Sequence, residues 1–321
     1  MANYVQIKSI TLKMNQKDFI IVILVLVVII LLIVVCSLGT AAGTLVQPVH
    51  RSMKNRNSYW EYEFIGDLKE PNRSPNPDEY DPNDCLLFLD LHHRLYRKEE
   101  SVPETMEHIG EFKKSNFLRF RVWKSKSLKQ YYIVFGGVAP KSGDDLRCTY
   151  YNLVAPYADD PEAKLHQGFY QMFEFDYKRV LDDFVSSSPT LLEKGMTIYL
   201  IGQSLGSMQA QLAAVYLKQL GAKDIRLFTF SSSRLGNRAM AKRVNESCTE
   251  SFTFLNTEDL FCNLPLAVMP YYRNQKMGLS YYHAGNQIVW LTMNEESMCA
   301  NHSSKTYIKL FRQQQNPVEP A

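Results

Sequence analysis

Ser204 lies in the segment Gly202-Gln203-Ser204-Leu205-Gly206, which matches the pattern G-x-S-x-G. The residues before it are rich in β-branched and aromatic types and predict a strand, whereas the residues after it have the apolar spacing of a helix. In this strand, turn and helix setting, glycines allow a tight turn that projects a serine hydroxyl beyond the sheet. The segment is therefore a candidate nucleophile elbow. The alternative is a plain tight turn whose serine only caps the helix.

A serine hydroxyl is a poor nucleophile unless a histidine takes its proton and a carboxylate orients that histidine. After an elbow of this type the acid and then the histidine follow in chain order, so both partners must lie beyond the serine. The histidines beyond it are His283 and His302. Asp259 and its neighbour Glu258 follow a β-rich run, where a carboxylate at the end of a sheet strand belongs. Chemistry alone leaves the choice of histidine and of acid open.

The elements that must position these residues alternate along the chain. Apolar periodicity predicts helices at 85–98, 169–184, 205–220 and 237–244, and strands at 117–123, 131–135, 196–201, 225–230, 251–255 and 288–291. This alternation favours an α/β fold with a mostly parallel central sheet and helices on both faces. His92, His93 and His108 precede the predicted sheet core, and we expect them at the surface.

Four segments besides the elbow carry recognisable patterns. They are Y-I-V-F-G-G-V at 132–138, H-Q-G-F at 166–169, F-T-F-S-S-S-R-L-G-N at 228–237 and N-T-E-D-L with a later L-P at 256–265. Together with the elbow they resemble the class 3 lipases, the fungal-lipase-like branch of the α/β hydrolases, over residues 130–310. The chain departs from the family where Gly136 replaces an arginine, Val138 a hydroxyl residue, Ser231 a glycine and Ser233 a proline.

The resemblance implies a catalytic triad of Ser204, Asp259 and His302. It favours His302 because the segment N-H-S-S-K-T-Y at 301–307 is similar to the family's H-x-x-x-x-Y before a closing helix. The segment around His283 instead resembles a non-catalytic stretch that leads into a late strand. In the same way, the family register favours Asp259 over Glu258.

The resemblance also implies an oxyanion hole built from the backbone N–H groups of Leu205 and Val138. Because the second donor is a backbone group, the missing hydroxyl at Val138 need not abolish the hole. Glycines 136 and 137 make the loop before it less preorganised. Residues 139–157 lie where the family places its lid.

Composition excludes several other classes of protein. The chain has 36 Lys and Arg against 33 Asp and Glu and is 45% hydrophobic, which argues against a disordered chain and against a nucleic-acid-binding polycation. Six cysteines occur without a C-x-x-C pair, so we predict no metal site. We expect no cofactor, and no protein partner can be inferred from the sequence.

An apolar run at residues 19–38 is long enough to cross a bilayer as a helix, and we predict that it is a signal anchor. The alternative is a cleaved secretory signal with its cleavage site near Thr40, Ala41 and Ala42, although the run is longer than the usual signal core. Basic residues on both sides nearly cancel the positive-inside bias. We favour a lumenal or extracellular catalytic domain, and a secreted enzyme if the run is cleaved.

The expected organisation is a tail at 1–18, the transmembrane helix at 19–38, a polar proline-punctuated spacer at 39–82, the hydrolase domain at 83–313 and a tail at 314–321. The expected function is a single-pass membrane-anchored serine lipase or esterase that hydrolyses glycerolipids or phospholipids through an acyl-enzyme on Ser204. One alternative is a catalytically weak or inactive lipase-like lipid-binding protein, because the oxyanion strand is altered. Another is an acyltransferase, because both reactions share the acyl-enzyme.

Overall fold

The structure, a computed structural model, describes residues 68–96, 102–114, 117–137, 154–157, 160–265, 268–269 and 279–315. All of these residues belong to one compact unit of the chain, residues 63–321. The predicted membrane span at 19–38 and Val138 lie outside the described residues. No helix within the described residues is both long enough and apolar enough to cross a membrane.

A seven-stranded sheet in the order β1-β2-β3-β6-β7-β8-β11 forms the centre of the domain. Its strands are β1 Met106–Lys114, β2 Phe117–Ser125, β3 Gln130–Phe135, β6 Thr197–Gln203, β7 Asp224–Phe230, β8 Glu250–Asn256 and β11 Gln287–Leu291. The first three pair antiparallel, and β3 to β11 pair parallel. The predicted α/β class with a mostly parallel sheet is confirmed. The sequence did not reveal β1, because this edge strand is rich in charged residues and is recognised only through its pairing with β2.

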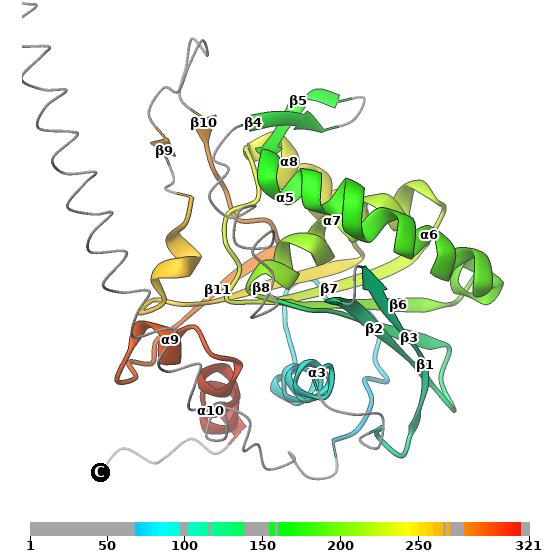
Figure 1. The fold of residues 1–321 in the computed structure, drawn as a ribbon. Helices are drawn as coiled ribbons and strands as arrows, with labels where there is room; N and C mark the ends of the chain where they lie inside the picture. The colour runs from blue at the N-terminus through cyan, green and yellow to red at the C-terminus, as the bar shows by residue number, and fades with distance from the viewer. Residues whose placement is uncertain are drawn as a thin grey trace, which may run out of the picture. The chain divides into compact units, whose positions relative to one another are not determined.

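Helices cover both faces of the sheet (Figure 1). Helices α3 Pro82–Arg94 and α10 Ser304–Gln315 lie on one face, with the short α9 Met298–Asn301 beside α10. The other face carries α5 Gln167–Met172, α6 Lys178–Ser187, α7 Leu205–Gln219 and α8 Arg238–Ser247. The helix predicted at 169–184 is interrupted by the π-helical segment η2 Phe173–Tyr177 between α5 and α6. Smaller elements are β4 Val154–Tyr157, β5 Asp160–His166, η3 Pro189–Leu192, η4 Leu260–Asn263, β9 Val268–Met269 and β10 Leu279–Ser280.

Helix α3 is more deeply buried than its sequence indicated. Phe88 packs against Phe228 and Tyr199 of the sheet, with ring centroids 4.6 and 5.2 Å apart. On its other side α3 packs against α10. The expectation that His92 and His93 lie at the surface is therefore wrong, because these residues are only 4% and 8% exposed.

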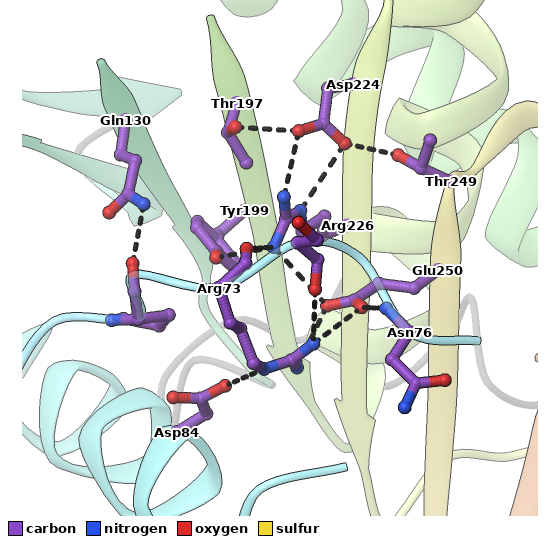
Figure 2. Close-up of polar contacts among 12 residues, drawn as sticks. Arg73, Asn76, Asp84, Gln130, Thr197, Tyr199, Asp224, Arg226, Thr249 and Glu250 are labelled. Carbon is purple, nitrogen blue, oxygen red and sulfur yellow. Dashed lines mark hydrogen bonds and ion pairs between the residues drawn. The ribbon is translucent and has the colours of Figure 1, made fainter. Parts of the chain in front are cut away.

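Residues 70–80, which the sequence prediction placed in the polar spacer, contact the domain. Arg73 donates hydrogen bonds to both carboxylate oxygens of Glu250 at 3.0 and 3.1 Å, and to Asp84 at 2.9 Å (Figure 2). The backbone N–H of Asn76 donates to Glu250 at 2.8 Å. We call Arg73, Asp84 and Glu250 the Arg73 clamp. Through the Arg73 clamp and the N–H of Asn76, residues 73–76 are part of the folded domain.

The Arg73 clamp lies at the amino-terminal ends of the parallel strands. Glu250 is the first residue of β8 and Asp224 the first of β7. Arg226 donates to the backbone carbonyl of Arg73 at 3.0 Å and to Asp224 at 3.2 Å (Figure 2). Burial raises the pKa of Asp84 to about 6, although Arg73 opposes this shift. A network of charges thus closes the end of the sheet opposite to the elbow.

Candidate active site

Ser204 stands on the turn between β6 and α7. Its backbone has φ 57° and ψ −129°, a conformation that non-glycine residues rarely adopt and that stores strain at functional turns. A Cβ atom on Gly202 would overlap the backbone of Gly206, and one on Gly206 would overlap the carbonyl oxygen of Phe135. Both glycines are therefore required for strand and helix to approach this closely, as the elbow pattern predicts.

The structure brings the three predicted triad residues together. His302 Nε2 lies 2.7 Å from Ser204 Oγ, and His302 Nδ1 lies 2.8 Å from Asp259 Oδ2. Asp259 follows β8 and is fully buried, whereas its neighbour Glu258 is exposed. His302 lies between α9 and α10, and its carbonyl oxygen accepts a hydrogen bond from Gln203 Nε2 at 2.7 Å. This chain of hydrogen bonds can pass a proton from serine to histidine while the carboxylate orients the imidazole.

Asp259 is held in its ionised form by several donors. The backbone N–H of Phe261 donates to Oδ1 at 2.9 Å, and Cys262 Sγ lies 3.2 Å from Oδ2. Burial favours the neutral carboxyl, but hydrogen bonds from His302, Ser231 and Cys262 outweigh it and hold the pKa of Asp259 below its usual value. An ionised Asp259 keeps the proton of His302 on Nδ1 and leaves Nε2 free to accept from the serine.

The sequence marked Ser231 only as a replacement for a family glycine and did not mark Cys262. Ser231 is fully buried and has φ 52°. Its hydroxyl donates to Asp259, and its Oγ lies 2.5 Å from His302 Nδ1. Its positive φ explains why glycine suits this position. The only sequence signal for Ser231 was that a serine occupies a position where the family has glycine. No sequence pattern pointed to Cys262.

His283, the rejected base, lies apart from this arrangement. Its ring contacts Trp290 with centroids 6.0 Å apart. Burial, with a contribution from Arg234, lowers the pKa of His283 to about 4. Among the described residues, no hydrogen bond links His283 to Ser204 or Asp259.

Of the two predicted oxyanion donors, the structure describes Leu205, whereas Val138 lies outside the described residues. Leu205 is the first residue of α7, so its N–H points from a helix N-terminus next to Ser204. Gly137, the residue before Val138, is described. A Cβ atom on Gly137 would lie 4.0 Å from Ser204 Cβ. The loop after β3 therefore reaches the nucleophile. Its Gly137 N–H donates to the phenol oxygen of Tyr96 at 2.7 Å, a contact that sequence reasoning missed.

An exposed apolar segment follows Asp259 and contacts the triad histidine through Phe261. Phe261 contacts the ring of His302 with centroids 4.5 Å apart. Leu260, Phe261 and Leu264 are 56%, 38% and 47% exposed. Within the part of the chain that the structure describes, no cluster of His, Cys, Asp and Glu side chains could hold a metal ion.

Residues 134–269 match the model of the family described as lipase (class 3). The chain is 32% identical over 101 residues to a secreted mono- and diacylglycerol lipase A of Penicillium cyclopium, covering 31% of this chain and 33% of that protein. It is 23% identical over 185 residues to the chloroplastic phospholipase A1-Ialpha2 of Arabidopsis thaliana, covering 49% and 38%. The chain thus spans a third or slightly more of the length of these curated relatives.

A fungal lipase solved as an inhibitor complex superposes with a TM-score of 0.51 at 19% identity, covering 64% of this chain and 85% of that chain. The sheet, the elbow and this likeness define an α/β-hydrolase fold. The resemblance to the class 3 lipases that the sequence motifs predicted is confirmed over residues 134–269.

Proposed function

We propose that this protein is a serine ester hydrolase that cleaves carboxylic esters of glycerolipids or phospholipids. The observation that carries the proposal is the continuous set of contacts from Ser204 through His302 to the buried Asp259. An inactive lipid-binding protein would have no need to keep these three groups at hydrogen-bonding distance. The contacts therefore favour the enzyme over that alternative.

The reaction follows from the geometry. His302 Nε2 accepts the hydroxyl proton of Ser204 as Oγ attacks the ester carbonyl, and the resulting oxyanion is stabilised by the N–H of Leu205. His302 then protonates the departing alcohol, which leaves an acyl group on Ser204. Water, activated by the same histidine, releases the fatty acid and restores the serine.

The substrate class is supported by two observations. The relatives are named as a mono- and diacylglycerol lipase and a phospholipase A1, which act on glycerolipid esters. Phe261 contacts the ring of the base and is partly exposed, as are its chain neighbours Leu260 and Leu264, so this segment offers apolar surface to an acyl chain. An alcohol in place of water would make the same acyl-enzyme an acyltransferase intermediate, and product analysis separates the two reactions.

A fluorophosphonate probe is expected to label the folded protein at Ser204, because the probe reacts with a serine that a neighbouring base activates. Peptide mass mapping identifies the labelled residue. Ser204→Ala should not be labelled, whereas Ser186→Ala, on the exposed surface of α6, should be labelled like the unaltered chain. Labelling that persists in Ser204→Ala, or that maps to another serine, would contradict the proposed nucleophile.

The proposal includes a membrane anchor at residues 19–38, which rests on the length of the apolar run. The full chain is then expected to remain with membranes in alkaline carbonate, and a chain that begins at residue 68 is expected in the supernatant. Release of the full chain by carbonate would contradict the anchor. A mature protein that begins near Ala42 would instead identify a cleaved signal and a secreted enzyme.

A further inference from the structure

The loop after β3 lacks the side chain that the class 3 pattern places there. Val138 stands where the family has a hydroxyl residue, and two glycines precede it. A hydrogen-bond donor near the developing oxyanion contributes strongly to acyl transfer. An active enzyme with this loop would gain from a hydroxyl supplied by another element.

Tyr96, two residues after the end of α3, brings a hydroxyl to this position. Its phenol oxygen accepts the N–H of Gly137 at 2.7 Å. The point where a Cβ atom of Gly137 would lie is 3.5 Å from this oxygen and 4.0 Å from Ser204 Cβ. Because residue 137 has no side chain, no Cβ atom occupies that point, which is near both the phenol and the nucleophile. Tyr96 is also 38% exposed.

The surroundings of Tyr96 hold it in place. The ring of the buried His92 packs edge-on against it with centroids 5.5 Å apart, and burial lowers the pKa of His92 to about 4. The end of α3 is tied to α10 by a hydrogen bond of 2.9 Å between His93 Nε2 and Ser304 Oγ. Ser304 is two residues after His302. The phenol and the catalytic base are therefore supported by the same contact between helices.

We propose that Tyr96 is an additional catalytic residue that donates its phenol hydrogen to the oxyanion. This inference rests on the proposed function. The phenol oxygen accepts the N–H of Gly137, which polarises its O–H bond, and the O–H donates to the ester carbonyl oxygen as that oxygen becomes negative. No bond to Tyr96 forms or breaks, and the phenol keeps its proton throughout.

Replacement of Tyr96 by phenylalanine tests the proposal, because it removes the hydroxyl and keeps the ring that packs on His92. With p-nitrophenyl butyrate as substrate, kcat is expected to fall about 10²-fold with little change in KM, as when one oxyanion donor is removed. The affinity for a trifluoromethyl ketone, which forms a tetrahedral adduct with the serine, should fall in proportion to kcat/KM. A purely structural role would not produce this proportionality. Melting temperature verifies that the variant is folded.

The control is Tyr282→Phe, which removes another partly exposed phenol and should leave kcat within about twofold. A Tyr96→Phe enzyme with unchanged kcat, or with weakened kcat but unchanged ketone affinity, would overturn the role of Tyr96. Fluorophosphonate labelling of Ser204 in the same variant would leave the proposed function standing. Absence of labelling in the unaltered chain would instead overturn the hydrolase itself.

Discussion

Replacing His302 with alanine is expected to lower ester turnover by about 10⁴–10⁶-fold, while replacing His283 with alanine leaves turnover within about tenfold. His302 Nε2 lies 2.7 Å from Ser204 Oγ, so its loss removes both the base for attack and the acid for the leaving group. Triad residues act as a unit, which is why a single loss is so costly. His283 contacts Trp290 instead.

Steady-state kinetics of the two alanine variants with p-nitrophenyl butyrate measure this difference. Melting temperatures recorded alongside separate a catalytic loss from an unfolded protein. An inactive but folded His283→Ala together with an active His302→Ala would show that the base has been assigned to the wrong histidine.

Replacing Arg73 with methionine is expected to destabilise the domain by about 3 kcal/mol, at the low end of the cost of breaking a buried ion pair. Glu250 is fully buried and would keep only the N–H of Asn76 at 2.8 Å and the more distant Arg226 at 4.0 Å. For a domain of this size the change corresponds to a melting temperature lower by roughly 6–12 °C. Thermal denaturation followed by circular dichroism measures it.

Lys242→Met is the matched control, because its ion pair with Glu246 is exposed on both sides and should contribute little. The double variant Arg73→Met/Glu250→Gln should recover part of the lost stability, since it removes the buried charge that Arg73 compensates. Equal melting temperatures for Arg73→Met and Lys242→Met would refute a stabilising Arg73 clamp. A chain that begins at Asn83 lacks Arg73 and should melt earlier than one that begins at residue 68.

The loss of folding stability caused by Arg73→Met is also expected to depend on pH. The pKa of Asp84 is about 6 in the folded protein, above its ordinary value, so ionisation of this group opposes folding as the pH rises through 6. Without the cation of Arg73 that pKa should rise further. The destabilisation should therefore be larger at pH 7.5 than at pH 5.

The elbow was predictable because its signal is local: a β-rich strand, a glycine-flanked serine and a helix occur within one short stretch. Asp259 and Glu258 were not separable by chemistry, because only the register of the loop after β8 decides which carboxylate is buried. Family resemblance supplied that register, and the structure places Asp259 beside His302.

Contacts between distant segments could not be predicted from local patterns. Tyr96 and Gly137 are separated by 41 positions, and Arg73 and Glu250 by 177. The proline-punctuated composition of residues 39–82 is typical of a linker, and nothing in it marks Arg73 as the partner of a buried carboxylate. Strand β1 was not predicted for a related reason. A charged edge strand is stabilised by pairing with its neighbour, and its own sequence shows no clear apolar alternation.

The position of the Arg73 clamp determines how the enzyme can be immobilised. The Arg73 clamp holds the first residue of β8, whereas Ser204 follows the last residue of β6, a strand of 7 residues. At about 3.3 Å per residue the two sites are separated by roughly 20 Å along the sheet. Mechanical load applied through the preceding residues, from a support or a fused protein, is therefore transmitted to this edge of the sheet by the Arg73 clamp and by the hydrogen bonds of Glu70 with Tyr132 and of Pro71 with Gln130. Ser204 stays at the opposite edge of the sheet, away from this load.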